Sequence, residues 1–228
     1  MTDQLGAVLF DMDGTLLATE QYWDQALVEL AAAWGHRVSA AALASTAGMD
    51  LPGALDVVGR DVGVDRTADE RAGDAERVLA RVTELMATSV SWCPGARALL
   101  LACLGDGVRT ALVTTTDRPL VTLVLEHLRA DLGTEPFEVT VCGDEVPARK
   151  PDPAPYRQAM AALGLGPAEC VVVEDSLTGS RAGLAAGCPV LVVPAGQGLP
   201  DLPGLTQVRT LVGITPDTLA GLLQAAPV

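Results

Sequence analysis

Short apolar runs rich in valine recur along the chain, and stretches with helical periodicity separate most of them. The runs cover residues 6–11, 110–114, 139–142, 170–174 and 189–193. Helical stretches are expected at about 96–104, 120–129, 154–163 and 178–186. Because the runs are continuously apolar rather than alternating, both faces of each strand should be buried. The pattern predicts an α/β fold in which helices cover both faces of a parallel sheet.

The pattern changes between about residues 18 and 90, where no convincing strand is found. Helical segments are expected there at about 20–34, 40–47, 52–58 and 68–88. A helical block of this size is too large to be an ordinary crossover between two neighbouring strands. We therefore expect an inserted all-helical subdomain at residues 18–90, and an α/β core assembled from residues 1–17 and 91–228.

The acidic composition limits the possible partners. The formal net charge is −14 and the isoelectric point is near 4.4, so the surface repels nucleic acids and anionic membranes. No apolar run approaches the roughly 20 residues that span a bilayer, and the first residues lack a basic start followed by an apolar stretch. We expect a soluble, cytoplasmic protein, a monomer or small homo-oligomer, with neither a nucleic-acid nor a membrane partner.

The cysteines and histidines offer little material for catalysis. The five cysteines are an odd number, are widely spaced and form no Cys-x-x-Cys pair. This is typical of reduced thiols packed as small apolar residues. With His36 and His127 as the only histidines, neither a histidine-rich metal site nor a Ser-His-Asp triad is expected.

Candidate chemistry lies at the carboxyl ends of the predicted strands, where open α/β sheets bind their ligands. The first run ends in one acid and is followed by a second, the second run ends in a threonine, and the fourth ends in an acidic pair. A lysine follows the third run. One rim of the sheet should therefore carry four carboxylates, a hydroxyl and an amine, from Asp11, Asp13, Thr114, Lys150, Glu174 and Asp175.

Carboxylates crowded on one rim repel one another unless a cation joins them. Because the rim offers hard oxygen ligands, Mg²⁺ is the natural ion. One carboxylate could then attack phosphorus as a nucleophile while a second acid protonates the leaving oxygen. Lys150 is the only lysine among the 15 basic residues, which favours a functional role for its compact ammonium group.

These residues resemble, in chain order, the four motifs of the haloacid dehalogenase superfamily of phosphatases and mutases. Asp-Met-Asp-Gly-Thr at residues 11–15 is similar to the first motif, Thr114 to the second, Lys150 to the third, and Glu174 with Asp175 to the fourth. Residues 143–156 resemble the β-phosphoglucomutase and phosphoglycolate phosphatase branch. The resemblance implies a Rossmann-like core, with the helical insert as a C1-type cap.

The resemblance also implies how the acids would act. Asp11 would be the nucleophile and a Mg²⁺ ligand. Asp13 would be the general acid and base, and would offer its backbone carbonyl to Mg²⁺. Asp175 would ligate Mg²⁺, with Glu174 beside it binding the metal directly or through water.

The phosphoryl group would be held by other parts of the same rim. Thr114 would hydrogen-bond it, helped by the backbone amides of Met12 and Thr115, and Lys150 would neutralise both the nucleophile and the phosphate. The side chains of Thr115 and Thr116 are expected to be ordinary β-branched residues at the end of a strand.

Taken together, these assignments predict a Mg²⁺-dependent phosphatase that hydrolyses a small phosphomonoester, such as a sugar phosphate, through an aspartyl-phosphate. A phosphomutase of the β-phosphoglucomutase type is the alternative, since Thr19 lies where that branch also carries a threonine. A dehalogenase would have no use for Asp13, because halide leaves unprotonated. The insert has no lysine for the Schiff base of a phosphonatase. A receiver-like domain or an inactive phosphate-binding protein is less favoured, because receiver domains carry their acid pair before the phosphorylated aspartate.

Overall fold

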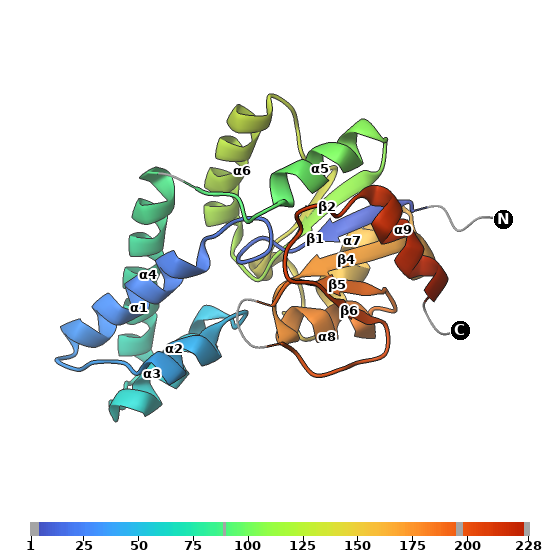
Figure 1. Ribbon diagram of the computed structural model, residues 1–228. Helices are drawn as coiled ribbons and strands as arrows, with labels where there is room; N and C mark the ends of the chain where they lie inside the picture. The colour runs from blue at the N-terminus through green and yellow to red at the C-terminus, as the bar shows by residue number, and fades with distance from the viewer. Residues whose placement is uncertain (1–4, 89, 195–197, 226–228) are drawn as a thin grey trace. The chain divides into compact units, whose positions relative to one another are not determined.

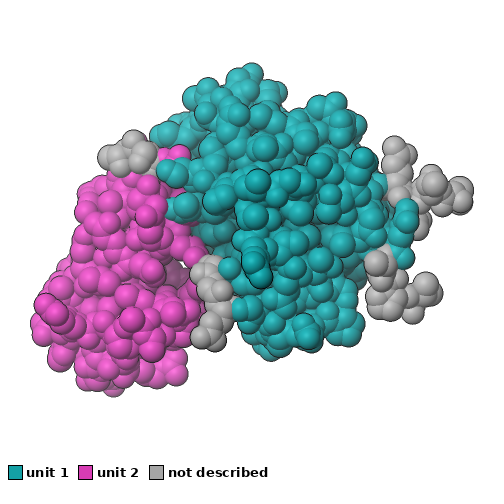
Figure 2. Space-filling view, in the orientation of Figure 1, with its two compact units in different colours: residues 1–18, 91–228 teal, residues 19–90 magenta. Residues whose placement is uncertain are grey.

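The computed structural model describes residues 5–88, 90–194 and 198–225. The chain divides into two compact units, which Figure 2 colours separately: Met1–Ala18 with Ser91–Val228, and Thr19–Val90. The first unit contains the β-sheet, and the second is built from helices. The predicted fold class, a parallel α/β sheet with an inserted helical subdomain, is confirmed.

Six parallel strands form the sheet within the described ranges, in the order β3-β2-β1-β4-β5-β6 (Figure 1). They are β1 (Ala7–Phe10), β2 (Arg109–Val113), β3 (Val139–Val141), β4 (Cys170–Glu174), β5 (Val190–Val192) and β6 (Leu205–Gln207). β1 lies between β2 and β4, so Phe10 is in register with Leu112 on one side and Val173 on the other. The strand order reverses at β1, and in sheets of this kind that point opens the ligand-binding crevice beyond the carboxyl ends of the strands.

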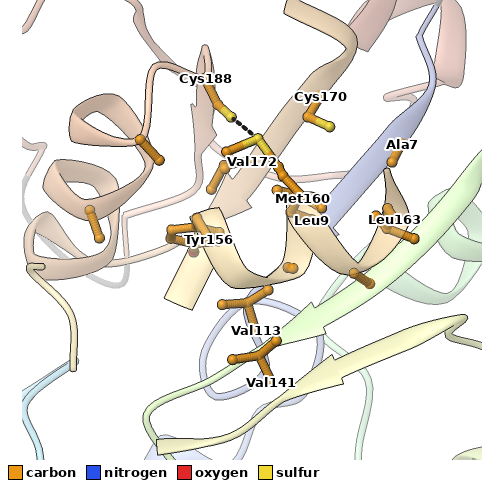
Figure 3. Close-up of a cluster of buried hydrophobic side chains, with 14 of the residues drawn as sticks. Ala7, Leu9, Val113, Val141, Tyr156, Met160, Leu163, Cys170, Val172 and Cys188 are labelled. Atoms are coloured by element: carbon orange, nitrogen blue, oxygen red, sulfur yellow. Dashed lines mark hydrogen bonds between the residues drawn. The ribbon is translucent and has the colours of Figure 1, made fainter. Parts of the chain in front are cut away.

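Helices cover both faces of the sheet. On one face α5 (Ala96–Gly105) packs with α9 (Pro216–Ala225), and on the other α7 (Ala154–Leu163) packs with α8 (Leu177–Ala185) (Figure 1). α6 (Arg118–Leu132) follows β2. Alternate strand residues point to opposite faces, and Leu9, Val113 and Val172 belong to the buried cluster around α7 (Figure 3). Burial on both faces explains why the strands are continuously apolar.

The helical unit consists of α1 (Glu20–Ala33), α2 (Ala40–Thr46), α3 (Leu51–Val62) and α4 (Ala68–Thr88). α4 packs against α1 and α3, and α2 packs against α3. α3 begins where the Asp50 carboxylate accepts a hydrogen bond of 2.9 Å from the Gly53 amide. It ends at Gly63, whose φ of 71° is a left-handed conformation that glycine adopts without steric cost. Nowhere in the described part of the chain is a helix both long and apolar enough to cross a membrane.

Candidate active site

Asp11 stands directly beyond β1, at the carboxyl end of the sheet. Its amide continues the ladder with a hydrogen bond of 3.0 Å to the carbonyl of Val173 in β4. After it the chain turns sharply, with Gly14 at a φ of 80° and its amide bonded to the carbonyl of Leu17 at 2.8 Å. The side chain of Asp11 is buried. The turn therefore holds a carboxylate in a protected position at the strand end.

Lys150 connects this carboxylate to the end of β4. Its Nζ donates to Oδ1 of Asp11 at 2.7 Å, to Oε1 of Glu174 at 2.7 Å and to the carbonyl of Val113 at 2.8 Å. An ammonium has three hydrogens to donate, and all three are used here. Lys150 also lies 4.9 Å from the ring centre of Tyr156. The single lysine of the sequence is thus buried and held in one position.

Glu174 is fixed even more completely. Its Oε1 accepts from Lys150 and from the hydroxyl of Tyr156 at 2.8 Å. Its Oε2 accepts from the amide of Asp175 at 3.1 Å, and from the amide and hydroxyl of Ser176 at 3.2 and 3.0 Å. Gly179 leaves the space for this carboxylate, because a Cβ there would lie 1.7 Å from Oε1. Five hydrogen bonds and a close glycine define the position of the side chain.

Three buried carboxylates gather at this point. Asp11, Glu174 and Asp175 each offer an oxygen, and these oxygens lie within 4.8 Å of one another. The one ammonium of Lys150 does not balance three carboxylates, so a cation would be stabilised here. Oxygen donors of this kind suit a hard divalent ion such as Mg²⁺. The residues that the sequence placed on one rim therefore have the chemistry of a divalent-cation site.

The ionisation of the cluster follows from burial and from the neighbouring charges. Burial raises the pKa of Asp11 to about 7, because Lys150 offsets only part of the desolvation and Glu174 adds repulsion. Burial would lower the pKa of Lys150, but the carboxylates of Asp11 and Glu174 raise it above its ordinary value. For Glu174, burial acts upward, but Lys150 and the Tyr156 hydroxyl bring the pKa below its ordinary value. Lys150 is therefore an ammonium and Glu174 a carboxylate at neutral pH.

Asp13 and the turn after β2 complete the rim. Asp13 accepts a hydrogen bond of 2.7 Å at Oδ2 from the hydroxyl of Thr116. The amide of Thr116 in turn donates to the hydroxyl of Thr114 at 3.1 Å. Within the described ranges no hydrogen bond uses the amide of Met12 or that of Thr115. Two backbone donors and a threonine hydroxyl are thus available beside the carboxylate cluster.

Arg149 ties the turn after β2 to the loop that carries Lys150. Its guanidinium donates to the carbonyl of Thr115 at 2.9 Å and to Oδ1 of Asp117 at 2.7 Å. Gly143 lies against the same carbonyl, where a Cβ would be 2.1 Å from the oxygen of Thr115. This close approach requires glycine and lets the two loops pack together.

The structure brings the predicted residues together and adds two that the sequence did not reveal. Asp11, Lys150, Glu174 and Asp175 form one cluster, and Asp13 and Thr114 stand at the same edge of the sheet. The Thr116 side chain, expected to be an ordinary strand-end residue, instead holds Asp13. Tyr156 was not singled out, since a tyrosine on a helix gives the same sequence signal as any core aromatic. The roles assigned to the individual residues stay predictions.

The fold and this site define a class of protein. The family of haloacid dehalogenase-like hydrolases matches residues 5–187, and the chain belongs to that family. The resemblance noted in the sequence and the prediction of a hydrolytic enzyme are both confirmed.

Individual relatives are similar over most of the chain. Protein CbbY of Rhodobacter capsulatus is 32% identical over 84% of this chain and 86% of its own. Hexitol phosphatase B of Escherichia coli (strain K12) is 30% identical over 87% of each chain. Crystal structures of CbbY from Rhodobacter sphaeroides, with phosphate and, for a mutant, with xylulose-(1,5)bisphosphate, superpose with TM-scores of 0.80 and 0.79. In both, the identity is 28%, and the match covers 95% of this chain and 99% of that one.

Proposed function

We propose that the protein is a Mg²⁺-dependent phosphatase that hydrolyses a small sugar phosphate through an aspartyl-phosphate on Asp11. The observation that carries the proposal is the Lys150 ammonium, which donates to both Asp11 and Glu174 at 2.7 Å inside the buried acidic cluster. A lysine so placed compensates the charge of a nucleophilic carboxylate and of a phosphoryl group beside it.

The first half of the reaction forms a bond between an Asp11 carboxylate oxygen and phosphorus, while the bond from phosphorus to the leaving oxygen breaks. Asp13 donates its proton to that leaving oxygen, so the sugar departs as a neutral alcohol. In the second half, water attacks the phosphorus and Asp13 takes a proton from it. The bond from phosphorus to Asp11 then breaks, which releases inorganic phosphate and regenerates the carboxylate.

The phosphoryl oxygens need donors while their charge is redistributed. The amides of Met12 and Thr115, neither of which is used by a described residue, are suited to this task. The Thr114 hydroxyl accepts from Thr116, which leaves its own hydrogen for the phosphate. Lys150 adds positive charge from the side of Asp11.

The metal site would consist of Asp11, the backbone carbonyl of Asp13, and Asp175. Bound Mg²⁺ would supply charge compensation to the phosphate and favour the ionised form of Asp11. Glu174 is better suited to binding the metal through water than directly, because both of its oxygens already accept hydrogen bonds. Its task would be to hold Lys150 and the start of α8.

The relatives support a proposal for the substrate class. One is named a hexitol phosphatase, and a mutant of another has been solved with a sugar bisphosphate. Both molecules are small polyhydroxylated phosphate esters. We infer a substrate of that class, whose phosphoryl group is transferred to water rather than to a second sugar hydroxyl.

A phosphate-release screen tests the proposal. Wild-type protein is incubated with hexitol phosphates, pentose bisphosphates, phosphoglycolate and nucleotides, with Mg²⁺ and with EDTA. Asp11→Asn should release no phosphate, while Asp106→Asn, at the opposite end of the sheet before β2, should match wild type. Loss of phosphate release in EDTA supports the metal. A separate isomerisation assay with β-glucose 1-phosphate distinguishes the alternative, because isomerisation without phosphate release would identify a mutase. Release by Asp11→Asn would refute the nucleophile.

A further inference from the structure

Tyr156 is a completely buried residue whose two ends lie in different surroundings. It lies on α7, and Figure 3 shows it with Met160 and Leu163 of that helix in the apolar cluster against the sheet. Its hydroxyl lies at the polar edge of that cluster and donates to Oε1 of Glu174 at 2.8 Å. A phenylalanine would fill the same apolar space. The hydroxyl therefore contributes something other than packing.

The acceptor of this hydrogen bond also holds the lysine. Oε1 of Glu174 receives both the Tyr156 hydroxyl at 2.8 Å and the Lys150 Nζ at 2.7 Å. The other oxygen of this carboxylate is held by the start of α8. Among the described residues, the Tyr156 hydroxyl is the donor that shares Oε1 with Lys150, so it helps to fix the side of the carboxylate that faces the ammonium.

The ring of Tyr156 acts on the same ammonium. Its centre lies 4.9 Å from Nζ, within the range of a cation–π contact. The three hydrogens of Nζ point to Asp11, Glu174 and the Val113 carbonyl. The ring contact therefore adds to three hydrogen bonds that already use every N–H of the ammonium. Lys150 is thus enclosed by three acceptors and one aromatic face.

We propose that Tyr156 is a positioning residue: its hydroxyl fixes Glu174, and through Glu174 and its own ring it keeps the Lys150 ammonium bonded to Asp11. As a statement about catalysis, this rests on the proposed phosphatase function. As a statement about where Lys150 lies, it stands independently and can be measured without any substrate.

The sequence offers an unusually direct probe, because Lys150 is the only lysine in the chain. Protein grown with lysine labelled with ¹⁵N at Nζ gives one side-chain ammonium signal. In wild type this signal should be visible and protected from exchange with water. Tyr156→Phe should shift it and increase its exchange, and Tyr156→Leu, which also removes the ring, should do so more strongly.

Leu163→Val is the matched control, since Leu163 lies on the same helix in the same cluster and its side chain has no polar atom. It should lower Tm but leave the Lys150 signal unchanged. Tyr156→Phe should lower Tm no more than this control does. A Tyr156→Phe protein with the wild-type lysine signal overturns the proposal.

Kinetics with p-nitrophenyl phosphate and Mg²⁺ form the second measurement. Displacing a catalytic group slightly costs far more in rate than in binding. Tyr156→Phe should therefore lower kcat about tenfold with KM within about twofold of wild type, while Leu163→Val keeps both values. Wild-type kcat in Tyr156→Phe overturns the positioning role. If wild type itself hydrolyses no ester in the screen, the proposed function fails, while the lysine signal still decides the structural claim.

Discussion

The hydroxyl of Thr116 donates a hydrogen bond of 2.7 Å to Oδ2 of Asp13. The two residues come from different loops, one after β1 and one after β2, and Thr116 is buried. The amide of Thr116 is fixed separately by the hydroxyl of Thr114. The proposed acid and base is therefore aligned by a neighbour whose own amide is held by a hydrogen bond.

Removing this donor should impair proton transfer. Thr116→Val keeps the shape of the side chain but removes the hydroxyl that contacts Asp13. We expect kcat to fall about tenfold with little change in KM, which is a part of the roughly 10²–10⁴-fold that general acid–base catalysis contributes. Steady-state kinetics on the best substrate of the screen measure the effect. Thr116→Ser restores a hydroxyl and should recover most of the rate. Equal rates in the Val variant and wild type would show that the hydrogen bond is incidental.

Arg149 should affect binding rather than chemistry. It holds the Thr115 carbonyl and Asp117, and so shapes the turn whose amide is proposed to bind phosphate. Arg149→Met should raise KM and the inhibition constant for inorganic phosphate several-fold, while kcat falls less. Because the side chains of the ion pair are 30% and 39% exposed, the loss of stability should be below about 1 kcal/mol.

A similar surface pair provides the control for that variant. Arg97 contacts Asp131 at 2.7 Å, with side chains 44% and 48% exposed. Arg97→Met should change Tm as little as Arg149→Met and leave KM unchanged. If both variants raise KM alike, or neither does, the role of Arg149 in shaping the turn is wrong.

The main parts of the fold and site could be predicted because they depend on simple rules. Continuous apolar runs predicted five of the strands, and the carboxyl ends of parallel strands necessarily meet at one edge. That rule alone places Asp11, Thr114 and Glu174 near one another. β6 was missed because its three residues are half-buried or exposed, so it gives no apolar signal. The Pro- and Gly-rich stretch 194–204 before it predicts a loop, and residues 195–197 of that stretch lie outside the described ranges.

The contacts that align the site could not be predicted in the same way. Thr116 and Asp13 are 103 positions apart in the chain, and their hydrogen bond depends on the paths of two loops and on side-chain rotamers. Tyr156 sits on a helix face that reads as ordinary core, and its hydroxyl gives no separate signal. Sequence patterns identify which elements carry reactive groups, whereas these contacts arise only from the packing of the folded chain.

The raised pKa of Asp11 predicts a pH-dependent stability. Burial moves this pKa from an ordinary 3.8 to about 7. In EDTA, between these two pH values, Asp11 is protonated in the folded protein and ionised in the unfolded chain. The contribution of Asp11 to stability is fully present below about pH 4 and is lost as pH rises through about 7. Asp11→Asn has no such titration. From pH 5 to pH 8, its Tm should therefore rise relative to wild type, by several degrees.

Adding Mg²⁺ provides the complementary measurement. At pH 8 the ion should raise the Tm of wild type, because it binds the ionised carboxylate only in the folded state. The increase should be smaller in Asp11→Asn, which lacks one charged ligand. A Tm difference between the two proteins that is the same at pH 5 and pH 8 in EDTA would contradict the raised pKa.

Lys150→Arg should be inactive although it keeps the charge. Three acceptors at 2.7–2.8 Å and the ring of Tyr156 surround the Nζ of Lys150. A wider, planar guanidinium cannot make the same set of contacts. We expect a loss in kcat of about 100-fold or more, comparable to removing a transition-state donor. Arg181→Lys, on the exposed side of α8, is the converse exchange and should keep wild-type rates. Activity in Lys150→Arg above about a tenth of wild type would mean that charge alone suffices.

Substituting alanine for glycine should have opposite effects on stability at two helical positions. A Cβ at Gly179 would lie 1.7 Å from Oε1 of Glu174, whereas one at Gly73 would meet nothing within 4 Å. Gly73→Ala should stabilise the protein by up to about 1 kcal/mol through helix propensity. Gly179→Ala should destabilise it by roughly 1–3 kcal/mol and lower kcat, because Glu174 must move away from Lys150. Urea unfolding and kinetics on both variants check this. If Gly179→Ala keeps wild-type stability and rate, the position of Glu174 does not matter to the site.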